Sequence, residues 1–151
     1  DQGKYFWELR SCAYYQEFER PKIMYPDIAQ GPEFTYDTDN YFLVNTLYLL
    51  PTDAKWLLGL LNSRVVFWFY SKTSVSIQGG FVRFFTQYIS QIPVPATGTN
   101  KALETLVDNI LTVKRANPAA DVFAMEREID QLVYKLYNLT DSEREIIEGA
   151  E

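Results

Sequence analysis

The sequence contains no histidine and only one cysteine, Cys12, in 151 residues. Without histidine there is no imidazole for general base catalysis, for a Ser–His or Cys–His nucleophile pair, or for a histidine metal site. A single cysteine forms neither an internal disulfide nor a thiolate zinc site, and this pattern indicates a reducing compartment. We therefore expect a cytoplasmic protein without these kinds of chemistry.

The sequence also has no long apolar run. The longest one, residues 56–70, is shorter than the roughly 20 residues of a membrane span, and Asn62, Ser63 and Arg64 interrupt it. We interpret it as a buried helix and expect no membrane partner. No signal peptide is visible. Because the sequence opens on Asp1 and not on Met, we expect a piece of a longer protein.

Aspartate and glutamate are absent from residues 54–103, although the chain has 20 acids and a net charge of −6. An even spread would place about 6 or 7 acids in that window. A buried core explains a lack of charge of both signs. However, basic residues persist in the window, which favours a surface that faces an anion. These bases are Lys55, Arg64, Lys72, Arg83 and Lys101.

The first 50 residues are β-rich in composition. Strands are predicted over residues 4–9, 21–28, 33–37 and 41–50. Turn residues at positions 38–40 predict a hairpin between the last two strands. Residues 11–20 are predicted to form a short helix or loop.

The middle of the chain is predicted to form a helix, a loop and a strand. The helix runs from about Pro51 to Tyr70, and Thr52 or Asp53 caps it. Residues 71–80 are polar and predict a loop. Residues 81–89 predict a strand whose core face carries Val82, Phe84, Thr86 and Tyr88, and whose other face carries Phe81, Arg83, Phe85 and Gln87.

The C-terminal part predicts a helical hairpin. Apolar residues recur at helical spacing from Asn100 to Asn117 and again over residues 121–139. Thr140 and Glu143 fit a capping box that opens a last short helix. The predicted fold class is therefore α+β. We expect residues 1–95 to form a mixed-sheet domain with a buried helix, and residues 96–151 to form a helical segment that contains the hairpin.

No motif in the chain predicts catalysis. The glycines in "QGG", residues 78–80, lack the lysine and the spacing of phosphate-binding loops. The acids Glu126, Glu128 and Asp130 alternate along a predicted helix and point in different directions, which favours a solvated face over a metal site.

Arg83 and Gln87 are the most informative polar residues. Arginine binds guanine and glutamine binds adenine through paired hydrogen bonds, and Gly79 and Gly80 allow a backbone to approach closely. A structural role explains Arg83 equally well. In that role its side chain stacks on a phenylalanine and pairs with a carboxylate of the same domain. The residues alone leave both interpretations open.

Five blocks, in this order, resemble the TaqI-like C-terminal specificity domain, which ends many bacterial adenine DNA methyltransferases and fused restriction–modification enzymes. They include "SVSIQGGFVRFFTQYISQIPVP" and together span nearly the whole chain. The blocks are residues 6–28, 41–51, 56–72, 74–95 and 127–148.

The resemblance implies that residues 1–95 are a recognition domain, which binds a specific sequence of double-stranded DNA beside a catalytic domain of the same chain. That domain would bind S-adenosylmethionine and take the flipped adenine. Its Asn/Asp-Pro-Pro-Tyr/Phe motif and cofactor glycines are missing here, so we expect this piece to be non-catalytic and to bind no cofactor. The candidate DNA contacts are Arg10, Lys22, Arg64, Lys72, Gly79, Gly80, Arg83 and Gln87.

Two alternatives remain at this point. The alternative role of Arg10 and Lys22 is a structural salt bridge, and Arg10 suits that role equally well because it lies beside Glu8. For the chain as a whole, the main alternative is a protein-interaction module that docks a partner through its aromatic surface and helical hairpin. Because residues 96–151 carry eleven acids and six bases, we expect the hairpin to pack on the recognition or catalytic domain and not on DNA.

Overall fold

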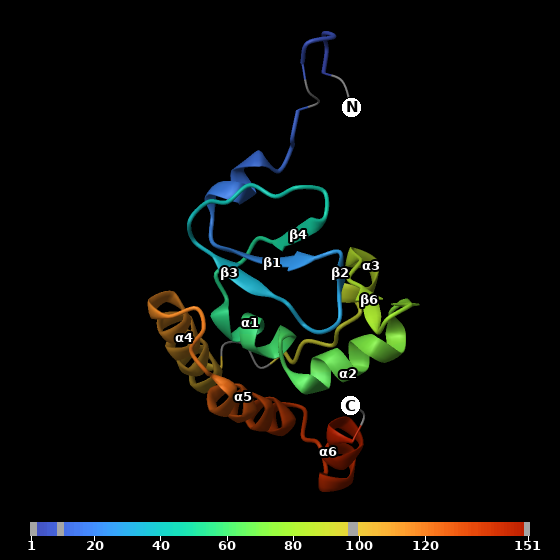
Figure 1. Cartoon of the computed structure of the whole chain (residues 1–151), viewed down its shortest axis with the longest axis vertical. Helices are drawn as coiled ribbons and strands as arrows, with labels where there is room; N and C mark the ends of the chain where they lie inside the picture. The colour runs from blue at the N-terminus through green and yellow to red at the C-terminus, as the bar shows by residue number, and fades with distance from the viewer. Residues whose placement is uncertain (1–2, 9–10, 97–99, 150–151) are drawn as a thin grey trace.

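Two three-stranded antiparallel sheets and a group of helices make up the described parts of the chain. The computed structural model describes residues 3–8, 11–96 and 100–149. Figure 1 shows the first sheet in the middle of the molecule, the second sheet beside α2, and the C-terminal helices on the far side from the N-terminus. The predicted α+β fold class is confirmed.

The first sheet has strand order β3-β1-β4, with β1 (Lys22–Pro26) in the centre, β3 (Thr35–Asp37) on one side and β4 (Leu47–Leu50) on the other. These strands lie inside the predicted ranges. The predicted hairpin between the last two strands is wrong, because Ile23 pairs with both Tyr36 and Leu50 and thus separates them. Hydrogen bonds at Asp37 explain why β3 does not continue directly into a hairpin. The Asp37 carboxylate accepts hydrogen bonds from the backbone N–H groups of Asp39 and Tyr41, and the chain turns there.

The N-terminal residues do not form the predicted strand. The described residues 3–8 form a turn in which the Gly3 N–H donates to the Glu8 carbonyl at 2.8 Å. Figure 1 shows this turn projecting away from both sheets, so it has no strand to pair with. A short 3₁₀-helix, η1 (Tyr15–Glu19), follows and confirms the prediction for residues 11–20.

The second sheet has strand order β2-β6-β5, with β2 (Ile28–Ala29), β5 (Ser76–Ile77) and β6 (Phe81–Arg83). The predicted loop therefore contains a strand, and the predicted strand over residues 81–89 ends at Arg83. The Phe84 N–H donates to the Asp27 carbonyl at 2.8 Å and its ring is buried. The chain then turns into α3 (Thr86–Ile89), so that Gln87 does not share a strand face with Arg83.

The predicted central helix is two helices, α1 (Lys55–Leu61) and α2 (Arg64–Thr73). Asn62 separates them because its side-chain amide bonds the backbone N–H and carbonyl of Phe34 at 3.1 and 3.0 Å. The predicted burial is confirmed, since Leu58, Leu60 and Tyr70 are buried. Among the described residues, no helix is long and apolar enough to cross a membrane.

The C-terminal helices are α4 (Lys101–Ala116), α5 (Phe123–Leu136) and α6 (Asp141–Glu148), and the predicted hairpin and capping box are confirmed. A Cβ atom on Gly59 of α1 would lie 2.9 Å from Val107 Cγ2, so α1 and α4 approach closely at this glycine. One buried cluster joins both predicted segments, and its members include Ile23, Leu60, Leu103 and Val133. The helical segment therefore completes the core of residues 1–95.

Candidate nucleic-acid interface

The turn between β5 and β6 is exposed and built on two glycines. Gly79 and Gly80 have φ values of +87° and +78°, a left-handed conformation that other residues rarely adopt. The Gln30 side chain donates to the Gly79 carbonyl at 3.1 Å and ties the turn to the segment after β2. No atom lies within 4 Å of a Cβ built on Gly80, so the turn presents open backbone to a ligand.

Replacing Gly80 with alanine is expected to lower the free energy of unfolding by about 1–2 kcal/mol, because alanine in a left-handed conformation carries that cost. Urea denaturation measures the change. Gly31→Ala is the matched control, since its Cβ also meets nothing within 4 Å and its φ is not positive. Equal losses in both variants would contradict the role of backbone conformation.

The Arg83 backbone is anchored on both sides. Its N–H donates to the Val75 carbonyl at 3.1 Å. Its carbonyl accepts from the Tyr70 hydroxyl at 2.5 Å and from the Ser74 hydroxyl at 2.6 Å. Burial raises the pKa of the Tyr70 phenol to about 12, so the hydroxyl keeps its proton and remains a donor. These hydroxyls fix the position of Arg83 at the end of β6.

The Arg83 side chain is held as firmly as its backbone. Its Nη1 donates to Asp27 Oδ2 at 2.7 Å, and its Cζ lies 5.1 Å from the centre of the Phe85 ring. This is the stacked, carboxylate-holding arrangement that the sequence left open. The side chain is nevertheless 35% exposed, so the guanidinium lies at the surface beside the glycine turn.

Lys22 is not at a surface, and its prediction as a DNA contact is corrected. The residue is fully buried. Its ammonium donates to the Phe18 carbonyl at 2.8 Å and forms an ion pair with Asp37. Burial alone would raise the pKa of Asp37, but Lys22 and the N–H groups of Asp39 and Tyr41 outweigh it and hold that pKa below its usual value. Lys22 on β1 therefore links η1 to Asp37 at the end of β3.

The other candidate contacts lie in different places. Lys72 is exposed in the last turn of α2, and its ammonium lies 5.9 Å from the Trp68 ring centre. Arg64 begins the same helix about 12 Å away along the axis, where its Nε lies 3.5 Å from Asp130 Oδ2. Gln87 is exposed on α3. Arg10 lies outside the described residues.

The structure thus brings together some of the predicted contacts at the end of α2 and the hairpin that follows it. We use the name hairpin surface for this region. Its residues are Lys72, Val75, Ser76, Gln78, Gly79, Gly80, Phe81 and Arg83, all exposed except the half-buried Arg83.

Acids from elsewhere in the chain neutralise much of the acid-free window. Lys55 pairs with Asp108, Arg64 with Asp130, and Arg83 with Asp27. Burial raises the pKa of Asp130, and the Arg64 backbone N–H and side chain oppose this. The excess of bases in the sequence therefore overstates the positive charge of the folded surface. Lys72 and Lys101, both exposed, have no ion pair among the contacts of the described residues.

Three positioning residues were missed by sequence reasoning, namely Asp27, Tyr70 and Ser74. Their contacts with Arg83 span 56, 13 and 9 residues along the chain. Tyr70 and Ser74 fall at the end of a predicted helix and in a predicted loop, and nothing in their local pattern indicates a bond to Arg83. The "PD" pair at residues 26–27 indicates a turn, but not an ion pair.

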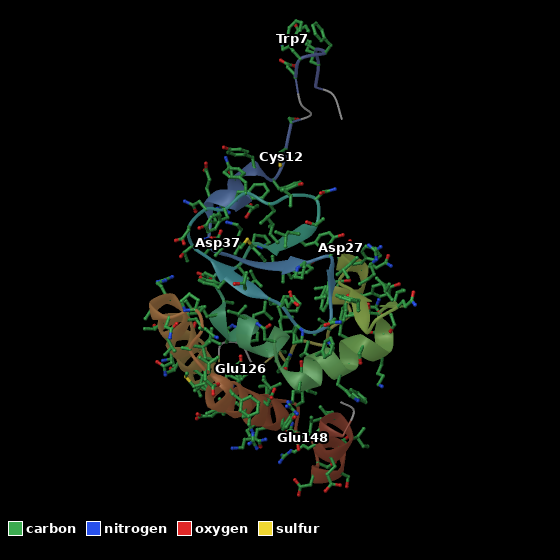
Figure 2. The ribbon with its side chains drawn as sticks, in the orientation of Figure 1. Trp7, Cys12, Asp27, Asp37, Glu126 and Glu148 are labelled. Atoms are coloured by element: carbon green, nitrogen blue, oxygen red, sulfur yellow. The ribbon has the colours of Figure 1, made fainter. Side chains whose placement is uncertain are left out.

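A second exposed region is aromatic and lies at the end of the first sheet that bears η1. Tyr14, Tyr15, Tyr41 and Phe42 are each more than half exposed. The rings of Tyr15 and Phe42 lie 5.5 Å apart. Figure 2 shows Trp7 at the tip of the projecting N-terminal turn above this region. The sequence indicated these residues only through its high aromatic content, 16%.

The grooves found among the helices of the described residues do not include the hairpin surface. One of about 140 Å³ lies between α2, α5 and α6 and is lined by residues such as Arg64 and Glu148. A groove of about 200 Å³ is lined mainly by apolar residues of α2, α6 and the segment before α4, such as Trp68 and Ile146. A groove of about 480 Å³ lies among β3, α1, α4 and α5, and its lining includes Arg64 and Glu126. In the described ranges, no three carboxylate or thiol side chains gather closely enough to hold a metal ion.

Comparison with known proteins identifies the family. Residues 4–94, more than half of the chain, match the family described as the TaqI-like C-terminal specificity domain. The chain belongs to this family. The specificity domain therefore includes both sheets, α1, α2 and α3, and it contains every candidate contact residue.

Curated relatives extend the match into the C-terminal helices. The chain is 30% identical over 131 residues to the type II methyltransferase M.XhoI of Xanthomonas vasicola, which covers 84% of this chain. It is 26% identical to M.PaeR7I of Pseudomonas aeruginosa over 86% of the chain, and 28% identical to M.BstVI of Geobacillus stearothermophilus over 87%. The chain spans about a fifth of the length of these relatives, 22% in each case.

Proposed function

We propose that this specificity domain recognises a short sequence of double-stranded DNA for a bacterial restriction–modification methyltransferase that acts on adenine in the cytoplasm. The family match over residues 4–94 carries the proposal. The relatives named as type II methyltransferases support it. The hairpin surface supports it further, because an open glycine turn, an exposed lysine and an anchored arginine suit contact with a nucleic acid.

Within this proposal, the residues of the hairpin surface have different roles in DNA binding. Lys72 is an exposed point charge and suits a phosphate, whereas Gly79 and Gly80 let the turn approach a groove closely. Gln87 on α3 and Arg64 at the start of α2 remain proposed contacts, as does Arg10. Lys22 is withdrawn because it is buried.

We also propose that methyl transfer belongs to a catalytic domain of the same longer chain. The linings of the grooves support this proposal, because none of them includes a glycine-rich loop of the kind that binds S-adenosylmethionine. The one glycine in these linings, Gly59, lies inside α1. The specificity domain would then contribute DNA binding and orientation, and no catalytic residue.

The purified chain is expected to bind a 20-base-pair duplex with a dissociation constant of about 10⁻⁴ to 10⁻⁶ M at physiological salt, in the range of non-specific binders. The acidic helices repel phosphate, which keeps this affinity low. Fluorescence anisotropy at several salt concentrations measures both the affinity and its dependence on salt.

Lys72→Gln should reduce the salt slope by about one, because one phosphate contact is lost. The matched control is Lys135→Gln, an exposed lysine on the acidic helix α5, which should leave the slope unchanged. Binding that does not depend on salt, or equal effects of the two variants, would contradict DNA contact at the hairpin surface.

A second candidate function is protein interaction through the exposed aromatic rings of Tyr14, Tyr15, Tyr41 and Phe42. The helical hairpin does not support this candidate, because Leu103 and Val133, two of the apolar residues that recur along it, are buried in the core. If the chain fails to bind the duplex at any salt concentration, this second function becomes the better explanation of the surface.

A further inference from the structure

The backbone of Asp27 is held by hydrogen bonds that do not involve Arg83. It lies at the bend between β1 and β2, where Figure 2 labels it. Its N–H donates to the Thr46 carbonyl at 2.9 Å, and its carbonyl accepts from the Phe84 N–H at 2.8 Å. The carboxylate therefore projects from a backbone that both sheets hold.

The negative charge of the Asp27 carboxylate is balanced by Arg83. Oδ2 accepts from Arg83 Nη1 at 2.7 Å. Oδ1 is buried and has no hydrogen-bond partner within the described part of the chain. The Asp27 side chain is 21% exposed and the Arg83 side chain 35%, so the pair lies at the surface but is partly shielded from water.

Four contacts together hold Arg83 in place. Asp27 binds Nη1, and the Phe85 ring lies against the guanidinium, with its centre 5.1 Å from Cζ. The hydroxyls of Tyr70 and Ser74 anchor the Arg83 carbonyl. A guanidinium has five N–H donors, and the bond to Asp27 uses one on Nη1. A side chain that is already ordered loses less entropy when it binds a ligand.

The charge of the pair determines what it recognises. Asp27 cancels the positive charge of Arg83, and its carboxylate repels a phosphate that approaches the same guanidinium. A neutral acceptor meets no such repulsion. The O6 and N7 atoms of guanine in the major groove are neutral acceptors at the spacing of the arginine fork.

We propose that Arg83 reads a guanine edge and not a phosphate, and that Asp27 is the positioning residue that sets this preference. The inference rests on the proposed DNA-binding function. It deepens that function by naming the chemical group that the hairpin surface recognises.

Salt dependence provides the first test, with the chain and a 20-base-pair duplex of fixed sequence. Arg83→Ala should leave the salt slope unchanged, because a contact to a neutral base edge neutralises no phosphate. Asp27→Asn should steepen the slope by about one and tighten non-specific binding, because it frees one positive charge for a phosphate. An ion pair that lies away from the bound DNA would move neither slope.

Selection from a pool of duplexes with a randomised centre provides the second test. The parent chain should enrich guanine at one position, by about 5- to 150-fold over the other bases if the contact is bidentate. Arg83→Ala and Asp27→Asn should both lose this enrichment. Lys72→Gln should weaken binding and keep it. Thermal melting of each variant shows which are folded, and Asp27→Asn carries the test if Arg83→Ala does not fold.

Each other result overturns the inference that Arg83 reads a guanine edge. A slope that falls by about one in Arg83→Ala shows a phosphate contact and overturns the inference, while the proposed function stands. Lower melting temperatures with unchanged slopes and enrichment show a structural pair and also overturn it. If the parent chain binds no duplex, the proposed function fails and the inference fails with it.

Discussion

Aspartate in place of Leu103 is expected to destabilise the fold by about 5 kcal/mol or more, which approaches the whole stability of a typical domain. Leu103 is fully buried on α4, and a Cβ on Gly59 would lie 3.2 Å from its Cδ2. The substitution therefore places an unpaired charge between α1 and α4. Urea denaturation followed by circular dichroism measures the loss.

Ala102→Asp is the matched control. Ala102 precedes Leu103 in the same first turn of α4 and is exposed. An acid at either position gains equally from the helix dipole, so that only burial distinguishes the two variants. The control is expected to stay within about 0.5 kcal/mol of the parent. Similar stabilities for both variants would show that α4 does not complete the core of residues 1–95.

Replacing Lys22 with methionine is expected to cost about 3–5 kcal/mol, because it leaves the buried Asp37 carboxylate without its partner. Lys22 is fully buried, and its pair with Asp37 lies beneath η1. The matched control is Lys55→Met. Lys55 pairs with Asp108 at the surface, where the side chains are 32% and 49% exposed, and such pairs contribute at most about 1 kcal/mol.

The pH dependence of the Lys22→Met variant distinguishes a broken pair from lost packing. The pKa of Asp37 is lowered in the folded parent, so its contribution is present above the unfolded pKa of about 3.9 and is lost as pH falls through the folded pKa. In the variant, burial favours the protonated carboxyl. The stability gap between parent and variant should therefore shrink from pH 7 to pH 3. A constant gap would indicate that only packing was lost.

Ion pairs with distant acids lower the positive charge that the acid-free window would otherwise give the folded surface. A window without acids suggests a positive surface, yet Asp27, Asp108 and Asp130 reach three of its five bases. On the proposed function, binding would depend on a few placed side chains and on a separate catalytic domain, and less on a broad positive field. This agrees with the weak binding expected of the chain alone.

The sequence by itself determined the features that depend on neighbours within about four residues. The 3.6-residue spacing of apolar side chains predicted α4 and α5, and Thr140 with Glu143 predicted the capping box of α6. Composition located β1 and β3. The ordered blocks also predicted the family, because a family pattern is itself a property of the linear sequence.

Only the tertiary structure decided which distant residues meet. The order β3-β1-β4 depends on a strand that enters between two others, and the break at Asn62 depends on the backbone of Phe34, 28 residues away. The end of β6 depends on Phe84 turning into the core. The candidate site is decided in the same way: Arg83 is equally suited by its local sequence to a DNA contact or an ion pair, and Asp27, 56 residues away, fixes its orientation. Such contacts form only when burial of the core brings the segments together, and no local pattern carries them.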